Sequence, residues 1–183
     1  NWLEFSGYNI DFGLELTSIS AIMILIITGI GSLIHLYSIG YMHDEVGAGR
    51  FFAYLNLFCF MMILLVLSDS LLFTFFGWEG VGLCSFLLIG YWYQKEDYIQ
   101  NAKKAFVMNR IGDVGFLLGM FVLFYHFGSL NYSAIHAGFL AKGIPVELAT
   151  LAALFLFVGA TGKSAQIPLY TWLPDAMVGP TPV

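Results

Sequence analysis

An acid and a base occupy the interiors of two apolar stretches, where ionised side chains are rare. Glu79 lies in the run FFGWEGVGLCSF within Ser70–Tyr93, and Lys163 lies within Leu148–Tyr170. A charged side chain at the centre of a membrane-spanning helix costs about 2.5–3.5 kcal/mol on insertion scales. Proteins that keep an acid and a base at such depth usually use them to move ions or protons. These two residues are therefore the first candidates for function.

Glu79 is predicted to lie near the middle of the membrane. It is the tenth residue of its stretch, so a rise of 1.5 Å per residue puts it about 15 Å into a core of about 30 Å. Gly77, Gly80 and Gly82 surround it and let neighbouring helices approach and supply partners. The alternative is a protonated or hydrogen-bonded glutamate that only stabilises the fold.

Lys163 precedes Pro168 by five residues. Proline removes a backbone donor and clashes with the carbonyl four residues back, here that of Ser164, so the helix should break beside the lysine. The freed carbonyls, with Thr161, Ser164 and Gln166, could hold water, as in transporter sites at membrane depth. A movable carboxylate would then change the proton affinity of the lysine. The alternative is a lysine that extends to the interface.

Arg110 and Asp113 form a second candidate pair. They are three residues apart in the apolar stretch Ala105–Phe127, so they share a helix face and can pair. Arg110 is placed about 8 Å from the start of this stretch, close enough to reach the interface. The pair is equally compatible with a functional role and with a structural ion pair.

The remaining polar residues give weaker signals. His35, near a helix end, is the best of the four histidines, although each is more often an interfacial polar residue than a proton relay. Asp175 follows Pro174 and could cap a helix or orient a loop. Cys59 and Cys84 lie in apolar stretches without a CxxC or Cys/His pattern, so metal ligation is not expected. We find no GxGxxG or P-loop pattern that would indicate a nucleotide site.

Composition places the chain in the membrane. Of its 183 residues, 59% are hydrophobic and 10% are charged, whereas soluble domains have about 25% charged residues. The mean hydropathy is +0.82. A membrane helix needs about 20 apolar residues, and five segments qualify. These predicted spans are Leu16–Tyr37, Phe51–Ser68, Ser70–Tyr93, Ala105–Phe127 and Leu148–Tyr170.

The connections between the predicted spans set the orientation. The loops 38–50 and 94–104 hold four Lys or Arg residues, whereas the segments on the other side hold only Lys142. The positive-inside rule therefore puts these two loops in the cytoplasm or matrix. Ser68, Asp69 and Ser70 form a tight turn between two spans. In the loop 128–147, Asn131 or Ser133 is a plausible cap for a short surface helix.

Three runs carry a resemblance to a known family: GWEGVGLCSFLLIGYWY, NAKKAFVMNRIGDVG and GATGKSAQIPLYTWLPDAMVGPTPV. With LIHLYSIGYMHDE, they closely resemble the antiporter-like chain L, or subunit 5, family of proton-pumping NADH–quinone oxidoreductase, respiratory complex I. The resemblance covers essentially the whole chain, in order. Because family chains are about three times longer, residues 1–183 are expected to be a single membrane domain of a longer protein.

The resemblance implies a fold and a set of roles. The fold is an all-α, polytopic transmembrane helix bundle with one broken helix, part of an inverted repeat, here the first half-repeat plus a preceding helix. Glu79 corresponds to the acid of the fifth family helix and Lys163 to the lysine of the broken seventh. Asp113 and Arg110 correspond to the polar pair of the sixth. Glu79 is implied to tune the proton affinity of Lys163 during proton translocation.

The resemblance also implies a setting for the chain. No cofactor is expected in it, because NAD, FMN, iron–sulfur clusters and quinone belong to other subunits of the complex. The expected partners are antiporter-like membrane subunits, the lipid bilayer and protons, with no nucleic acid. The bacterial inner membrane is the expected location, with the mitochondrial inner membrane as the alternative.

Three other functions are compatible with these sequence features. An Mrp-type Na⁺/H⁺ antiporter subunit and a membrane-bound hydrogenase subunit share these motifs. A scaffold bundle, in which Glu79 and Lys163 only neutralise each other, needs no transport at all.

Overall fold

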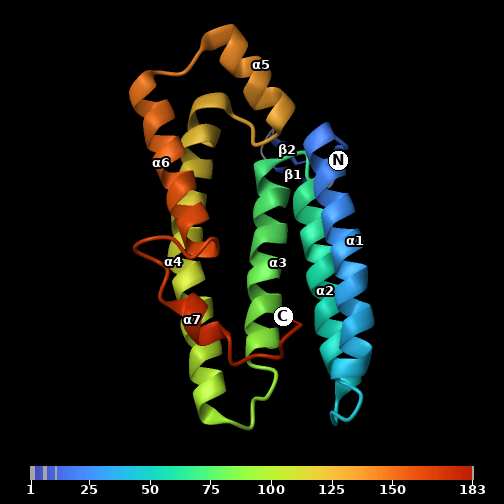
Figure 1. Cartoon of the computed structure of the whole chain (residues 1–183). Coiled ribbons are helices and arrows are strands. Elements are labelled where there is room, and N and C mark those ends of the chain that lie inside the picture. Colours follow the sequence, from blue (N-terminus) through green and yellow to red (C-terminus); the bar gives the residue numbers. More distant parts are fainter. Residues whose placement is uncertain (1–2, 6–7, 11, 183) are drawn as a thin grey trace.

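The structure is a computed structural model that describes residues 3–5, 8–10 and 12–182. It is a bundle of long helices standing side by side (Figure 1). Within the described residues, five helices are long and apolar enough to cross a membrane, which confirms the five predicted spans and the all-α class. These helices are α1 (Ser18–Tyr41), α2 (Ala48–Leu67), α3 (Leu71–Ile89), α4 (Glu96–Phe127) and α6 (Val146–Lys163).

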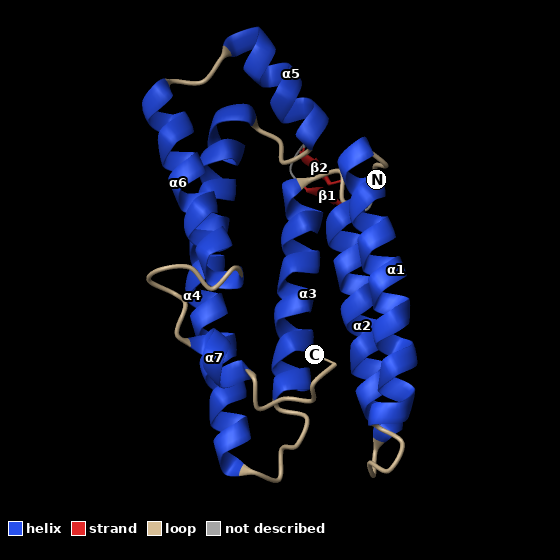
Figure 2. Ribbon diagram, viewed as in Figure 1, coloured by secondary structure: helices blue, strands red, loops and turns tan. Residues whose placement is uncertain are grey.

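Four shorter elements complete the fold (Figure 2). Strands β1 (Leu3–Phe5) and β2 (Tyr8–Ile10) pair in antiparallel fashion, an addition that the apolar pattern did not predict. Helix α5 (Tyr132–Lys142) is the predicted surface helix. It begins after Asn131, although the Asn131 side chain makes no capping hydrogen bond. Helix α7 (Trp172–Ala176) follows the break after α6.

Helix α4 starts nine residues earlier than predicted, at Glu96. Two acids, Glu96 and Asp97, lie in its first turn, where they interact favourably with the partial positive charge of a helix N-terminus. A hydropathy criterion excludes this charged turn from a span. Arg110 is consequently the fifteenth residue of α4, about 21 Å along it. The prediction that Arg110 lies near the helix start is therefore wrong.

Helix α6 ends directly at Lys163, as expected from the position of Pro168, and does not continue to Tyr170. Ala165 takes a left-handed backbone conformation with φ 49°, and an irregular segment then leads to α7 (Figure 2). The Ser164 hydroxyl donates to the Ala160 carbonyl at 2.6 Å. The backbone N–H of Gln166 donates to the Thr161 carbonyl at 2.9 Å. The predicted span Leu148–Tyr170 therefore ends seven residues early.

Helix α1 contacts α2, while α3 lies between α2 and α4, and α4 packs along α6. Only Ser20 and Ser38 of α1 are buried, and its apolar side chains are mostly exposed. An exposed apolar face of this kind is suited to lipid or to further membrane helices.

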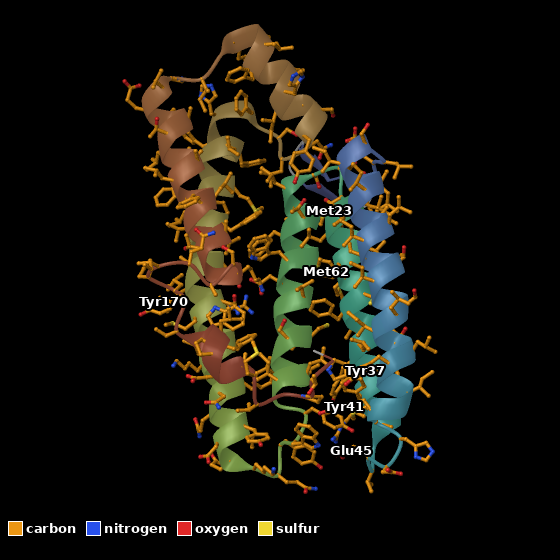
Figure 3. All side chains as sticks on the ribbon, viewed as in Figure 1. Met23, Tyr37, Tyr41, Glu45, Met62 and Tyr170 are labelled. Carbon is orange, nitrogen blue, oxygen red and sulfur yellow. The ribbon has the colours of Figure 1, made fainter. Side chains whose placement is uncertain are left out.

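The loops α1–α2 and α3–α4 lie at the end of the bundle opposite α5 (Figure 1). In Figure 3, Tyr41 and Glu45 lie at this end. The turn at residues 68–70 joins α2 to α3 at the other end, where the Ser70 hydroxyl accepts from the Phe73 N–H at 3.4 Å. The predicted loops 38–50 and 94–104, which hold Arg50, Lys95, Lys103 and Lys104, therefore lie at one end of the bundle. That this end faces the cytoplasm or matrix stays a prediction.

The closest approach of α4 and α6 depends on glycine. A Cβ atom at Gly112 would lie 3.0 Å from the Gly162 Cα, which is closer than ordinary van der Waals contact. A Cβ atom at Gly29 in α1 would meet nothing within 4 Å. A side chain at Gly112 would therefore require the α6 backbone to shift by a few tenths of an ångström, whereas α1 has room at Gly29.

We predict that Gly112→Ala destabilises full-length protein in detergent, because overpacking costs about 1–3 kcal/mol. The measurement is the midpoint of thermal unfolding. Gly29→Ala is the matched control and should leave the midpoint unchanged or raise it, since alanine favours the helix by about 0.5–1 kcal/mol. Equal midpoints for the two variants would contradict the close α4–α6 packing.

Candidate functional site

Four charged side chains gather where α3, α4 and α6 meet. Glu79 comes from α3, Arg110 and Asp113 come from α4, and Lys163 is the last residue of α6. The Arg110 guanidinium forms an ion pair with the Glu79 carboxylate. Two acids and two bases leave the cluster without formal net charge. This balance matters, because an uncompensated charge in the interior of a protein costs about 3–5 kcal/mol.

Trp78 contacts both Asp113 and Lys163. Its indole Nε1 donates to Asp113 Oδ1 at 2.7 Å, and Asp113 is only 3% exposed. The Lys163 Nζ lies 5.9 Å from the centre of the Trp78 ring, within the range of a cation–π interaction. Sequence reasoning missed Trp78. Its place immediately before Glu79 is the signal that could have found it.

The Lys163 ammonium occupies space that a glycine leaves free. A Cβ atom at Gly82 of α3 would lie 2.5 Å from the lysine Nζ, so a larger residue there would displace the amine. Asp113 and Glu79 both lie close enough to Lys163 to act on it electrostatically. Among the described residues, neither carboxylate forms a direct ion pair with Lys163. The lysine also lies at a helix C-terminus, where the helix dipole favours a cation.

The sequence allowed Arg110 and Asp113 to pair, but among the described residues each has another direct partner. The two residues do share a helix face, but that face turns toward α3, which offers other partners. The Arg110 guanidinium forms an ion pair with Glu79. The Trp78 indole donates a hydrogen bond to the Asp113 carboxylate. The helical spacing correctly predicted the shared face and could not predict what lies across from it.

The carbonyls at the end of α6 are bonded within the chain. The Trp172 Nε1 donates to the Gly162 carbonyl at 3.0 Å, and Gln166 N–H occupies the Thr161 carbonyl. The Thr161 hydroxyl donates to the Val158 carbonyl at 2.7 Å. These groups thus have partners within the chain, and that they also hold water stays a prediction.

Asn109 is a second polar residue that sequence reasoning missed. It precedes Arg110 in α4 and is 5% exposed. Its Nδ2 donates to the Ala105 carbonyl at 2.8 Å, while its Oδ1 is buried without a hydrogen-bond partner among the described residues. It lies one helical turn before Asp113, and this polar spacing within an apolar helix is the signal that could have found it. Its free oxygen can accept a hydrogen bond next to the charged cluster.

The weaker sequence candidates have other partners. The His35 Nδ1 lies 2.7 Å from the Gly31 carbonyl oxygen, and His35 lines a cavity of about 540 Å³ between α1, α2, α3 and α7. His43 pairs with Asp44 in an exposed loop at 2.8 Å. Asp175 in α7 pairs with Lys104 of α4 at 2.6 Å, so it orients the segment after the break.

Metal ligation has no support within residues 12–182. No group of three or more His, Cys, Asp or Glu side chains there is arranged to hold a metal ion. Cys59 and Cys84 are both free thiols. The chemistry of the cluster is therefore that of two carboxylates, an amine and a guanidinium.

A bundle of membrane-length helices with a broken helix ending at an interior lysine places this chain among the antiporter-like membrane proteins. The family model described as NADH:quinone oxidoreductase/Mrp antiporter, TM, matches residues 68–183. A second, described as NADH-Ubiquinone oxidoreductase (complex I), chain 5 N-terminus, matches residues 2–52. The chain belongs to the NADH:quinone oxidoreductase/Mrp antiporter membrane family, as the sequence resemblance indicated.

Individual relatives agree with this assignment. The chain is 50% identical to NADH-quinone oxidoreductase subunit L of Mycobacterium tuberculosis over all of its own length, and covers 28% of that relative. It is 45% identical to NADH-ubiquinone oxidoreductase chain 5 of Chondrus crispus, again over its whole length, and covers 29% of that protein. The chain thus spans less than a third of the length of these relatives.

A solved structure shows the same fold. A chain in the structure of the Mrp complex from Dietzia sp. DQ12-45-1b is 29% identical to this chain, with a TM-score of 0.80. The similarity covers 92% of this chain and 18% of that one.

We predict that Trp78→Phe lowers the thermal stability of full-length protein, because it removes the indole N–H and leaves the buried Asp113 carboxylate short of one donor. Loss of a hydrogen bond to a buried charged group corresponds to about 1.5–3 kcal/mol. The unfolding midpoint in detergent measures the effect. Trp92→Phe is the control, because the Trp92 indole has no hydrogen-bond partner among the described residues. Equal midpoint shifts in both variants would contradict the role of the Trp78–Asp113 bond.

Proposed function

We propose that this chain is the proton-translocating part of a membrane subunit of NADH:quinone oxidoreductase, corresponding to chain L or chain 5. The observation that carries the proposal is the charge-balanced cluster around Lys163, at the end of a broken helix and in the middle of the bundle. The relatives at 43–50% identity carry the names of such subunits and support the choice of complex.

The geometry suggests how protons move through the cluster. Arg110 holds Glu79 in an ion pair. In our proposal, opening the Arg110–Glu79 pair frees the Glu79 carboxylate to turn toward Lys163 and stabilise its ammonium form. Closing the pair again withdraws that carboxylate and favours release of the proton. Glu79 and Lys163 are thus the proton-handling residues, and Asp113 and Arg110 support them from α4.

The proposal assigns redox chemistry to other subunits. NAD, FMN, iron–sulfur clusters and quinone would be bound elsewhere in the complex, and other antiporter-like membrane subunits would flank this chain. Residues 1–183 would form one membrane domain, the first half-repeat and a preceding helix of an inverted-repeat fold. We favour the bacterial inner membrane, because a bacterial relative is 50% identical. The mitochondrial inner membrane is the alternative.

A second function has one specific observation in its favour. The TM-score of 0.80 to a chain of an Mrp complex makes a Na⁺/H⁺ antiporter subunit the alternative. The antiporter function ranks second because this chain is only 29% identical to that Mrp chain, which is below its identity to the NADH-quinone oxidoreductase relatives. A dependence of transport on Na⁺ would distinguish the two.

The test is Lys163→Ala in the full-length protein, measured as NADH-driven acidification of inverted membrane vesicles at matched amounts of assembled complex. We predict that acidification falls at least tenfold while the assembled complex remains, because no other amine at this position can carry the proton. Lys103→Ala removes an exposed lysine of α4 and is the matched control.

Two outcomes would contradict the proposal. Unchanged acidification with alanine at position 163 would make Lys163 structural. Acidification that is lost but restored by added Na⁺ would instead favour the antiporter function.

A further inference from the structure

A second site lies away from the charged cluster, at the end of the bundle that carries the α1–α2 and α3–α4 loops. It is a cavity of about 350 Å³ between the start of α2, the end of α3 and the start of α4. Of its lining residues only Arg50 is charged, and three are tyrosines, Tyr54, Tyr91 and Tyr93. The function proposed above does not use this cavity.

Arg50 is held in place but remains accessible. Its guanidinium carbon lies 5.0 Å from the centre of the Tyr91 ring and 4.9 Å from that of Tyr93. One guanidinium nitrogen donates to the Tyr91 carbonyl oxygen at 3.3 Å, and the residue is exposed. A guanidinium has five N–H donors in a planar fork that matches phosphate geometry. The aromatic rings therefore orient the Arg50 guanidinium, which keeps N–H groups that can donate to a ligand.

Tyr91 supplies a second donor. The residue is 2% exposed. Its hydroxyl donates no hydrogen bond among the described residues, although the Arg50 guanidinium lies close enough to interact with it. Burial raises the pKa of the Tyr91 phenol, so at neutral pH the group remains a hydroxyl with a proton to donate. Leaving such a group unpaired costs about 1–3 kcal/mol, and a ligand that accepts its hydrogen bond recovers this energy.

The start of α2 adds to the positive potential of the cavity. A Cβ atom at Gly47, the residue before α2, would lie 3.5 Å from the Tyr91 hydroxyl oxygen, so this hydroxyl lies beside the helix N-terminus. Gly47 has no side chain to cap that end, and helix N-termini favour anions. Glu45 in the α1–α2 loop (Figure 3) acts on Tyr91 electrostatically, but it is not a lining residue of the cavity.

We propose that this cavity binds the phosphate of an anionic membrane lipid, with the Arg50 guanidinium pairing with the phosphate and the Tyr91 hydroxyl donating to it. The depth of the site favours a lipid over a soluble anion, because the cavity lies where membrane-length α2 begins and α3 ends. Tyrosines are enriched at this interface. The positive-inside rule assigns this end to the cytoplasm or matrix, whose leaflet carries the anionic lipids.

The test uses the assembled full-length complex in detergent, titrated with phosphatidylglycerol, with bound lipid counted by native mass spectrometry. We expect saturable binding that Arg50→Gln weakens about tenfold, since the lost contact is a charge-assisted hydrogen bond. Tyr91→Phe, which keeps the ring and removes only the hydroxyl, should weaken binding about threefold. Lys95→Gln removes an exposed loop cation that does not line the cavity and should leave binding unchanged.

Several results would overturn the proposal. Wild-type lipid affinity in Arg50→Gln would show that the guanidinium does not contribute to binding. Equal weakening in Lys95→Gln would indicate general surface charge. Full displacement of the lipid by inorganic phosphate would make this a site for free anions, and equal binding of phosphatidylcholine would remove the preference for anionic lipid. If Arg50→Gln does not assemble, Tyr91→Phe decides, and wild-type affinity in that variant contradicts the proposal.

Discussion

The balance of charge among Glu79, Arg110, Asp113 and Lys163 is the constraint on which the rest of this structure depends. A buried ion such as Asp113, which is 3% exposed, loses its hydration at a cost of several kcal/mol, which well-placed partners must offset. The Arg110 side chain is 48% exposed, so its own cost is smaller. The Arg110–Glu79 ion pair and the Trp78–Asp113 hydrogen bond provide such partners across α3 and α4. Removing any one charge leaves another uncompensated, so α3, α4 and α6 must keep their mutual positions.

Close packing and the helix break bring the lysine to these partners. The approach of Gly112 to Gly162 holds α6 directly against α4, and α6 then ends at Lys163. The break costs little, because Trp172 and Gln166 occupy the carbonyls it exposes. The lysine therefore lies at the end of α6, close to the carboxylates of Glu79 and Asp113.

Much of this arrangement could be predicted from the sequence, because the spans are long and apolar and Pro168 fixes where α6 can end. The candidate residues stood out because charge is rare in such helices. Their partners could not be predicted in the same way, since helices that are apolar on all sides give no sign of which face meets which neighbour. Trp78 and Asn109 were missed because neither carries a charge, and the start of α4 was missed because its charged first turn does not look like a membrane span.

A double substitution separates charge balance from proton transfer most directly. In the full-length complex, Lys163→Gln with Asp113→Asn removes one charge of each sign and keeps side chains of similar size. The measurement is the unfolding midpoint together with NADH-driven acidification of inverted vesicles, for the double variant and for each single variant. The account predicts that the double variant regains much of the stability lost by Lys163→Gln while acidification stays abolished. Recovery of acidification along with stability would show that Lys163 is only a counter-ion, and would contradict the account.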